Sequence, residues 1–352
     1  MIKKIFNCIS IHSGGGINYL SMMHNDIDKK DNLIFLDQRA KKSLKPFIYA
    51  ETIFFKKNLF RNLFVFKERL KCFIIFKRSL RRNNNKQYFK EYFLNGIPPL
   101  IRFPISTNEV FILFQNKNLF SYLNYFDNKL FLKFNFIIYH LIHSFLINSF
   151  LKRTDKIIVQ TKTMKKNISN LKPKNKILIQ DKYWKNLKLE SYNQNPIEQD
   201  INNKASLLLE RIKDLSKINK IFFYPSSFDP HKNHKILFNA FNKLSSSSKK
   251  NVKLIVTIDE NKVPFKFKNK DPIIFIGNQP MNVISHIYSI ADFLIFPSLN
   301  ESLGLPLIEA SFYKLPIIAS NLDYVYEVCN PNITFNPLSE EDIYKKILEA
   351  IN

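Results

Sequence analysis

The sequence predicts an α/β protein with two domains, each a parallel β-sheet with helices packed on it. Strand-like apolar runs alternate with helical stretches through most of the chain, which is typical of parallel α/β layers. The 352 residues exceed one typical domain of roughly 100–200 residues. A polar, irregular stretch at 186–203 (NLKLESYNQNPIEQDINN) divides the series in two. We therefore expect an N-terminal domain over 1–185, a linker over 186–203 and a C-terminal domain over 204–352.

The first half contains four apolar runs of strand length, separated by helical stretches. We place these strands at 3–10, 33–36, 109–114 and 156–160, and helices at 17–25, 120–152 and 162–170. The region 51–95 is rich in Phe, Lys and Arg, and we expect it to be a helical excursion. The apolar window at 130–153 is interrupted by Lys133 and lacks the roughly 18 uninterrupted apolar residues of a spanning helix, so we expect a buried or half-buried helix there.

The second half repeats the alternation more clearly. We expect strands at 221–225, 252–258, 272–277, 292–297 and 316–320, and helices at 233–244, 282–290, 306–313 and 339–350. In such folds ligands bind beyond the carboxyl ends of the strands. Two Rossmann-like domains with sheets facing one another would therefore share one cleft.

Composition limits the classes of protein. The three cysteines, Cys8, Cys72 and Cys329, have no CxxC spacing, so neither a disulfide framework nor a zinc site is predicted, and a reducing cytoplasm fits best. The net charge of +25 has two readings. In the first reading the charge reflects the over-use of Lys and Asn that an AT-rich genome produces. In the second reading the charge indicates a basic nucleic-acid-binding protein, although no recognisable binding module is present.

One segment concentrates the positive charge. Residues 56–82 carry ten basic residues and one acidic residue among Phe, Leu and Ile. A basic amphipathic segment of this kind can lie on an anionic membrane surface. The alternative is a helix packed on the sheet with a solvated Lys/Arg face.

The stretch NESLGLPLIEAS at 300–311 has the composition of a binding loop. Pro306 suits the first turn of a helix, and Gly304 lets the backbone approach a ligand closely. The free N–H groups of a helix N-terminus favour a phosphate or a sugar hydroxyl. Glu301 would lie in the loop and Glu309 one turn inside the helix, facing the same way, which suits two polyhydroxylated pieces of one ligand. The alternative is an acidic residue that only complements the helix dipole.

A second candidate loop, HSGGGINYL at 12–20, follows the first strand. The backbone at Gly15 and Gly16 could approach phosphates, or the glycines could form a plain tight turn. The loop matches the dinucleotide-binding pattern G-x-G-x-x-G poorly, because the third glycine of that pattern would fall at Tyr19. Asp37, at the end of the second strand, keeps an NAD-binding alternative open.

Other polar residues in the first half are candidates of lower specificity. His12 precedes the glycine loop, and Gln115 and Asn116 end a strand, so all three are candidates for acceptor or cleft contacts. His140 and His143 have the i, i+3 spacing of a metal-chelating pair, but no carboxylate lies nearby in the sequence, so packing is favoured.

The sequence FLIFPSLNESLGLPLIEASFYKLPIIAS resembles the E-x7-E region of the retaining, nucleotide-sugar-dependent glycosyltransferases of family four, which have the GT-B fold. The resemblance is strong over 155–337. Three further blocks agree in order and spacing: IIVQTKTMKKNI at 157–168, FFYPSSFDPHKNHKILFNAF at 222–241 and IIFIGNQPMNVISHIYSIADFLIFPS at 273–298. The earlier stretches YFLNGIPPLI (92–101) and VFILFQNKNLF (110–120) are similar to members found in surface-polysaccharide assembly.

The resemblance implies roles for individual residues. Glu309 would hydrogen-bond the ribose of the donor nucleotide, and Lys232 would neutralise the donor diphosphate, whose charge grows as it leaves. Glu301 would hold the transferred sugar together with the backbone N–H groups that follow it. Those groups belong to Ser302, Leu303, Gly304 and Leu305. Most members carry Gly-Arg where this chain has Ser226 and Ser227, so Ser227 would line the phosphate site and one cation is missing.

The resemblance therefore implies a retaining transfer of a sugar from a nucleoside diphosphate to a lipid-linked glycan or a lipopolysaccharide/O-antigen acceptor. No cofactor and no obligatory metal ion is implied. We expect a cytoplasmic protein, peripheral at the inner face of the membrane, that does not bind nucleic acid. One further alternative is an inactive sugar-nucleotide binder, because family members often continue beyond the equivalent of Asn352 into another helix.

Overall fold

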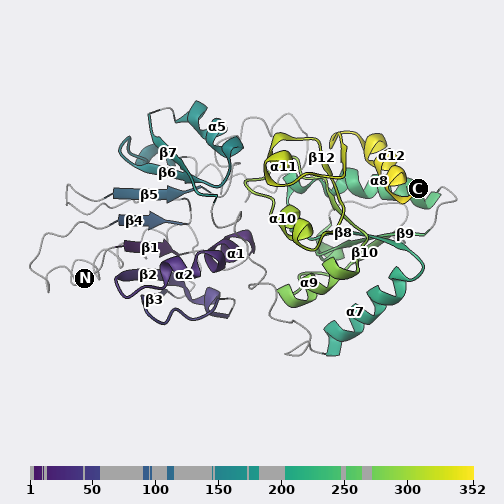
Figure 1. The fold of residues 1–352 in the computed structure, drawn as a ribbon, viewed down its shortest axis with the longest axis horizontal. Coiled ribbons are helices and arrows are strands. Elements are labelled where there is room, and N and C mark those ends of the chain that lie inside the picture. The colour runs from purple at the N-terminus through teal and green to yellow at the C-terminus, as the bar shows by residue number, and fades with distance from the viewer. Residues whose placement is uncertain are drawn as a thin grey trace, which may run out of the picture. The chain divides into compact units, whose positions relative to one another are not determined.

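The computed structural model describes residues 4–9, 11, 14–42, 44–55, 90–94, 96, 109–114, 145, 147–172, 174–181, 203–246, 251–263 and 272–352. The chain divides into two compact units, Met1–Asn186 and Leu187–Asn352, coloured from purple to teal and from teal to yellow in Figure 1. The expected linker at 186–203 lies outside the described residues except for Asn203.

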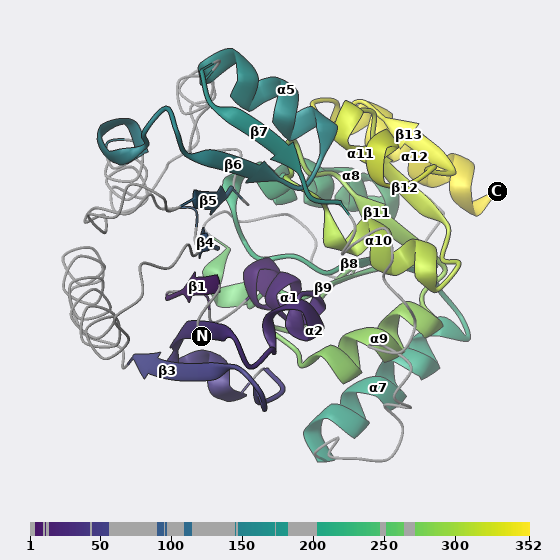
Figure 2. The same ribbon diagram turned by 60° about the vertical axis from the view of Figure 1, so that its left-hand side comes forward.

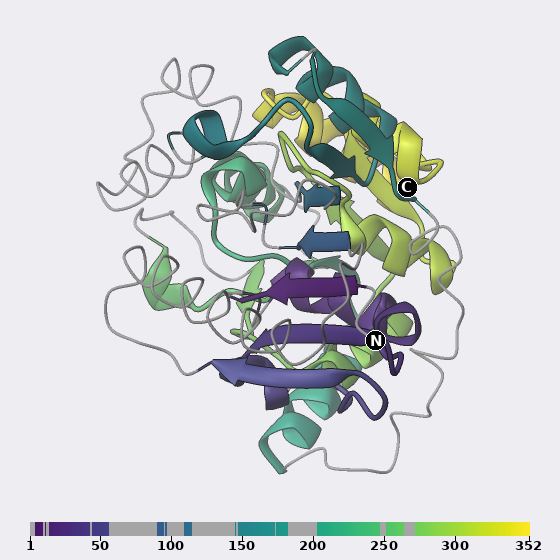
Figure 3. The same ribbon diagram turned by 90° about the vertical axis from the view of Figure 1, so that its left-hand side faces the viewer.

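The N-terminal unit is built on a seven-stranded parallel sheet with the strand order β3-β2-β1-β4-β5-β6-β7. The strands are β1 (Lys4–Cys8), β2 (Asn32–Asp37), β3 (Glu51–Phe55), β4 (Lys90–Phe93), β5 (Glu109–Leu113), β6 (Lys156–Val159) and β7 (Lys176–Ile179). In Figure 3 the purple and blue arrows of this sheet lie side by side and point the same way.

Helices cover both faces of this sheet with separate apolar clusters. The helical segments are α1 (Gly14–Met22), α2 (His24–Ile27), the 3-10 turn η1 (Gln38–Lys42) and α5 (Lys162–Leu171). Tyr19 and Leu20 of α1 belong to one cluster, and Met164 and Ile168 of α5 belong to the other. The Thr161 hydroxyl accepts a hydrogen bond from the Met164 N–H, so α5 begins with a side-chain cap.

The C-terminal unit has a six-stranded parallel sheet with the order β10-β9-β8-β11-β12-β13. The strands are β8 (Lys220–Tyr224), β9 (Val252–Val256), β10 (Ile273–Phe275), β11 (Phe293–Phe296), β12 (Ile317–Ser320) and β13 (Ile333–Phe335). The central strands are almost continuous apolar runs because both sheet faces are covered. Residues 221–224 (IFFY) have no exposed surface.

Two pairs of helices cover this sheet. The helical segments are α7 (Asn203–Ser216), η5 (Pro230–Lys232), α8 (His234–Ser246), η6 (Glu260–Lys262), α9 (Met281–Ile290), α10 (Leu305–Phe312), α11 (Asp323–Val328) and α12 (Glu340–Ile351). Helix α7 packs against α9 and α8 packs against α12. Figures 1 and 2 show the two pairs on opposite sides of the sheet.

Most of the predicted elements are confirmed, with boundaries shifted by no more than three residues. The helical excursion over 51–95 is wrong at both ends, where the chain forms the strands β3 and β4. Strand β3 is half-exposed at the sheet edge, so it lacks the apolar run that reveals a buried strand. The sequence prediction also missed one long helix and several short elements. These are α7, α11, β7 and β13.

Several expectations fall on residues that the structure does not describe. They are the basic segment at 56–82, the helix over 120–152 apart from its last turns, His140 and His143. Within the described ranges, no helix is long and apolar enough to cross a membrane. Those same ranges contain no group of three or more His, Cys, Asp and Glu residues placed to hold a metal ion.

Candidate functional site

An ion pair lies at the carboxyl edge of the C-terminal sheet, where β8 and β11 run side by side. Lys232 ends the short turn η5 after β8, and Glu301 lies in the loop after β11. The Lys232 Nζ is 2.5 Å from the Glu301 Oε1, and the two side chains are only 14% and 10% exposed. The ammonium also lies 5.9 Å from the ring centre of Phe296. The structure thus brings together two predicted site residues that are 69 positions apart in the sequence.

Hydrogen bonds fasten the two loops that carry this ion pair. The buried Tyr224 hydroxyl donates to the Lys232 carbonyl at 2.9 Å and lies 3.0 Å from the Ser298 Oγ. The Leu299 N–H donates to the His231 carbonyl at 2.8 Å. Burial, followed by the charge of Glu301, raises the pKa of Tyr224, so its hydroxyl keeps its proton and remains a donor.

The loop after β11 leads into α10 through a glycine in the left-handed region. Gly304 caps α10 with φ 75° and ψ 57°, and a Cβ at this position would lie 3.1 Å from the Leu307 Cδ1. Helix α10 begins at Leu305, one residue before the predicted start, with Pro306 in its first turn. The chain therefore reaches the helix N-terminus beside the ion pair in a conformation that favours glycine.

The second carboxylate of the motif has a different environment. Glu309 is buried in α10 and accepts a hydrogen bond of 2.7 Å from the Tyr288 hydroxyl of α9. Tyr288 stacks on Tyr313, with ring centres 5.3 Å apart. Glu301 and Glu309 therefore have different partners, a loop lysine and a helix tyrosine, which the sequence spacing does not reveal.

Ser226 and Ser227 stand where the resemblance led us to expect Gly-Arg, and both are held by hydrogen bonds. The Ser226 Oγ is 2.9 Å from the His234 Nε2, and the Ser226 N–H donates to the Thr257 Oγ1 at 2.8 Å. The Ser227 hydroxyl donates to the Asp229 carboxylate. Neither serine supplies the missing positive charge.

Two histidines flank the lysine, and burial disfavours their charged forms. Burial, with a further contribution from Lys232, lowers the pKa of His234 to about 3. Burial also lowers the pKa of His231, where the charge of Glu301 acts in the opposite direction. Lys232 is therefore the principal cation of this loop at neutral pH.

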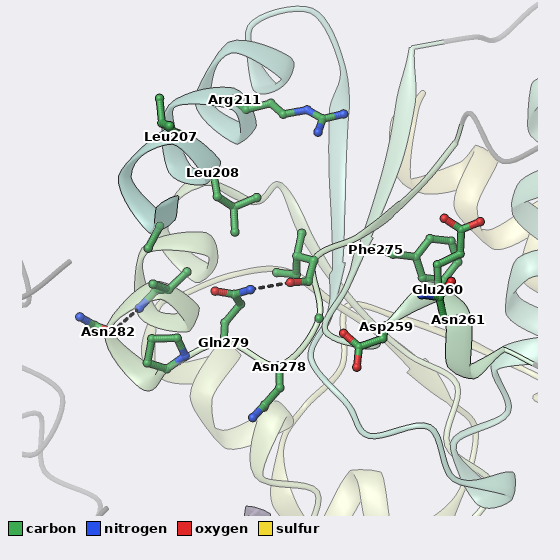
Figure 4. A pocket seen from close by; sticks show the side chains of 15 residues that line it. Leu207, Leu208, Arg211, Asp259, Glu260, Asn261, Phe275, Asn278, Gln279 and Asn282 are labelled. Carbon is green, nitrogen blue, oxygen red and sulfur yellow. Dashed lines mark hydrogen bonds between the residues drawn. The ribbon is translucent and has the colours of Figure 1, made fainter. Parts of the chain in front are cut away.

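A pocket of about 740 Å³ opens at the carboxyl ends of β9 and β10 (Figure 4). Leu208 and Arg211 of α7 line one side, and Asp259 and Phe275 line another. Gly277 has φ 67°, and a Cβ there would lie 2.6 Å from the Asp259 Oδ1, so glycine lets the two loops approach. The sequence prediction missed this pocket, although the strand ends near 258 and 277 were a signal for it.

The first-half candidates are only partly described. Gly15 and Gly16 lie in the first turn of α1 rather than in a loop before it. His12, Gln115 and Asn116 lie outside the described residues. Asp37, on which the NAD alternative depended, ends β2 and forms an ion pair with Arg39 at 2.5 Å.

Comparison with solved structures defines the class of fold. The chain superposes over its whole length on 90% of HepE from Anabaena, solved in complex with UDP and glucose, with a TM-score of 0.64 and 15% identity. It also covers 90% of WaaG, a glycosyltransferase involved in lipopolysaccharide biosynthesis (TM-score 0.59, 12% identity, all of this chain). Sucrose-phosphate synthase from Thermosynechococcus elongatus matches over 99% of this chain and 90% of its own, with a TM-score of 0.63 and 14% identity. These likenesses confirm the expected GT-B fold of two Rossmann-like domains.

Sequence comparison finds a match to a protein family within the C-terminal unit. Residues 209–352 match the family "Glycosyl transferases group 1". The chain is 34% identical over 73 residues to the O-antigen chain mannosyltransferase RfbU of Salmonella typhimurium, covering 20% of this chain and 21% of RfbU. It is 30% identical over 146 residues to an uncharacterized 41.2 kDa protein in the cps region of Klebsiella pneumoniae, covering 40% and 39%. The matches thus span about a fifth and two fifths of these relatives.

Proposed function

We propose that the protein is a glycosyltransferase that moves a sugar from a nucleoside diphosphate to a glycan acceptor. The observation that carries this proposal is the largely buried Lys232–Glu301 pair, with side chains 14% and 10% exposed, at the carboxyl edge of β8 and β11. This pair lies inside the region that matches the group 1 glycosyl transferases. An ammonium and a carboxylate held next to a helix N-terminus suit a ligand that carries both phosphates and sugar hydroxyls.

In this proposal each part of the site binds one part of the donor. Lys232 neutralises the diphosphate, whose negative charge grows as the bond to the sugar breaks. Glu301 accepts hydrogen bonds from sugar hydroxyls, and the backbone N–H groups of 302–305 complete that subsite. The pocket at the ends of β9 and β10 takes the base, because it opens at the same edge of the same sheet.

The role proposed for Glu309 follows from its burial. Its carboxylate oxygen already accepts the Tyr288 hydroxyl, and a carboxylate has further lone pairs that the ribose hydroxyls can use. Tyr288 then orients Glu309 by holding one oxygen. A buried carboxylate oriented by a tyrosine hydroxyl is suited to accept hydrogen bonds from the ribose hydroxyls.

The acceptor is proposed from the relatives. The names of RfbU and WaaG refer to O-antigen and lipopolysaccharide synthesis, and the Klebsiella relative lies in a cps region. A lipid-linked glycan or lipopolysaccharide acceptor at the inner face of the membrane fits these names. The basic segment at 56–82 supports peripheral contact with anionic lipid. We further propose retention at the anomeric carbon, with neither a cofactor nor an obligatory metal ion.

The test is a screen of UDP-, GDP- and dTDP-sugars for binding and slow hydrolysis, with wild type and Glu309→Ala in parallel. Wild type should bind one nucleotide class, and Glu309→Ala should weaken that binding by about 1–3 kcal/mol, as expected for loss of a buried charged hydrogen bond. Glu349→Ala is the matched control, because that carboxylate pairs with Lys346 on the exposed face of α12. Absence of nucleotide binding, with salt-sensitive binding of DNA or RNA instead, would favour the nucleic-acid alternative.

A further inference from the structure

Asn233, directly after Lys232, has an unusual backbone conformation. Its φ of 60° and ψ of 31° lie in the left-handed region, and it forms the junction between η5 and α8. Among the described residues only one other non-glycine residue, Lys314, has a positive φ. Asparagine tolerates this region better than most residues, but glycine tolerates it best. Backbone conformation alone therefore does not account for an asparagine here.

The side chain of Asn233 makes contacts that glycine could not make. It is 7% exposed, and its Nδ2 donates to the Pro337 carbonyl at 2.7 Å and to the Pro297 carbonyl at 3.2 Å. An amide NH2 group has two hydrogens, and both are used. Pro297 directly follows β11, and Pro337 lies between β13 and α12. One buried side chain thus ties together the loops after β8, β11 and β13.

These loops carry the two charges of the proposed donor site. Lys232 precedes Asn233, and Glu301 lies four residues after Pro297. A lysine side chain has four rotatable bonds, so its ammonium is placed accurately only if the backbone below it is fixed. The Asn233 amide provides that fixation through two backbone carbonyls, which do not depend on the charges of Lys232 and Glu301.

We propose that Asn233 is a positioning residue that sets the distance between Lys232 and Glu301 and so determines how tightly the site holds the donor diphosphate. This inference rests on the proposed function. Asn233 acts through Lys232, so its effect should appear only with ligands that carry phosphates. It should also disappear when Lys232 is absent.

The experiment is a double-mutant cycle on the full chain. Binding of UDP, GDP, dTDP and the three corresponding nucleosides is measured for wild type, Asn233→Gly, Lys232→Ala and the double variant. Asn233→Gly keeps a left-handed backbone and removes both amide hydrogen bonds. We expect it to weaken binding of the preferred diphosphate about tenfold, while nucleoside binding is unchanged and Lys232→Ala suffers no further loss.

Asn32→Ala is the matched control. Asn32 is also a buried asparagine whose Nδ2 donates to two backbone carbonyls, those of Ile27 and Asp26, at the amino end of β2 in the other unit. It should lower the melting temperature without changing the ratio of diphosphate to nucleoside affinity. If Asn233→Gly does not fold, Tyr224→Phe takes its place, because it removes the hydroxyl that holds the Lys232 carbonyl. We expect a loss of about threefold in the same direction.

Equal loss of diphosphate and nucleoside binding in Asn233→Gly, or an equal loss in the Lys232→Ala background, would overturn the positioning role. Unchanged diphosphate binding in a folded Asn233→Gly protein would also overturn it, while leaving the proposed function intact. If wild type binds none of UDP, GDP and dTDP, the proposed function fails and this inference fails with it.

Discussion

In the part of the chain that the structure describes, lysine–glutamate contacts next to a phenylalanine ring occur in both sheets, and they lie at different sheet edges. Lys232 and Glu301 lie at the carboxyl edge of the C-terminal sheet beside Phe296. Lys156 pairs with Glu109 beside Phe111, and these two residues begin β6 and β5, at the amino edge of the N-terminal sheet.

The two ion pairs also differ in how much of their side chains is exposed to solvent. The side chains of Lys232 and Glu301 are 14% and 10% exposed, whereas those of Lys156 and Glu109 are 24% and 40% exposed. The Glu109 Oε2 also lies 3.4 Å from the Lys90 Nζ, so a second cation and solvent both interact with this carboxylate. Ligands of parallel α/β folds bind at the carboxyl edge. The same chemical pair therefore suits ligand binding at one edge and strand pairing at the other.

The largest effect is expected from breaking the largely buried Lys232–Glu301 pair. Lys232→Met leaves the Glu301 charge unpaired and should cost about 3 kcal/mol of unfolding free energy, whereas Lys232→Met combined with Glu301→Leu should recover most of that loss. Both proteins should lose diphosphate binding. Urea unfolding and UDP or GDP titration measure the two quantities. A double variant that regains stability and still binds diphosphate would show that the pair is purely structural.

A pH effect of about 2 kcal/mol is expected from His234. Burial lowers its pKa from 6.5 to about 3, so the folded protein binds this proton less tightly than the unfolded chain. Its contribution is complete above pH 6.5 and is lost as the pH falls towards 3. Between pH 7 and pH 5 wild type should lose about 2 kcal/mol more than His234→Phe, as measured by urea unfolding. Equal losses in the two proteins would mean that His234 is not buried in its neutral form.

Gly304→Ala should have an effect of about 1–2 kcal/mol on unfolding, because alanine at φ 75° is strained and its Cβ would crowd Leu307. The loop that carries Glu301 would shift, so donor binding should weaken as well. Thermal unfolding and nucleotide titration test both effects. Gly96→Ala, at φ 73° in the other unit, is the control that should lower stability without affecting nucleotide binding. Equal effects of the two substitutions on nucleotide binding would contradict this assignment.

The smallest effect is expected from the amino-edge pair. Hydrogen bonding to Lys156 lowers the pKa of Glu109, so its stabilising contribution is present at neutral pH and is lost as the pH falls through its folded pKa. Because Glu109 is 40% exposed, solvent screening keeps that contribution under about 1 kcal/mol. Glu109→Gln should lower the urea midpoint slightly at pH 7, and the difference from wild type should shrink as the pH falls. A change at pH 7 as large as that of Lys232→Met would remove the contrast between the two edges.

The sequence was most informative where strands are fully buried. The runs that became β8, β9 and β11 are continuous and apolar, so their positions and the loops after them were predictable. Strand β3 was missed because an edge strand exposes half of its residues and shows no apolar run. Helix α7 was missed because no element was placed between the end of the predicted linker at 203 and the strand at 221.

The candidate site was predictable as a set of residue types but not as a set of contacts. The positions of Glu301, Glu309 and Lys232 followed from motif spacing and resemblance. Sequence spacing contains no information on the partner of a side chain across the sheet, so neither the Lys232–Glu301 contact nor the Tyr288–Glu309 hydrogen bond was foreseen. The pairing of β8 with β11 creates the first of these contacts.

The most direct test of the account compares the two lysines. The dissociation constant of the preferred nucleoside diphosphate is measured for wild type, Lys232→Ala and Lys156→Ala at two salt concentrations. Lys232→Ala should weaken binding at least about tenfold and reduce the salt dependence, because a charged hydrogen bond to phosphate is lost, while Lys156→Ala should match wild type. Equal affinities for all three proteins, or equal losses in the two variants, would contradict a donor site at the carboxyl edge of β8 and β11.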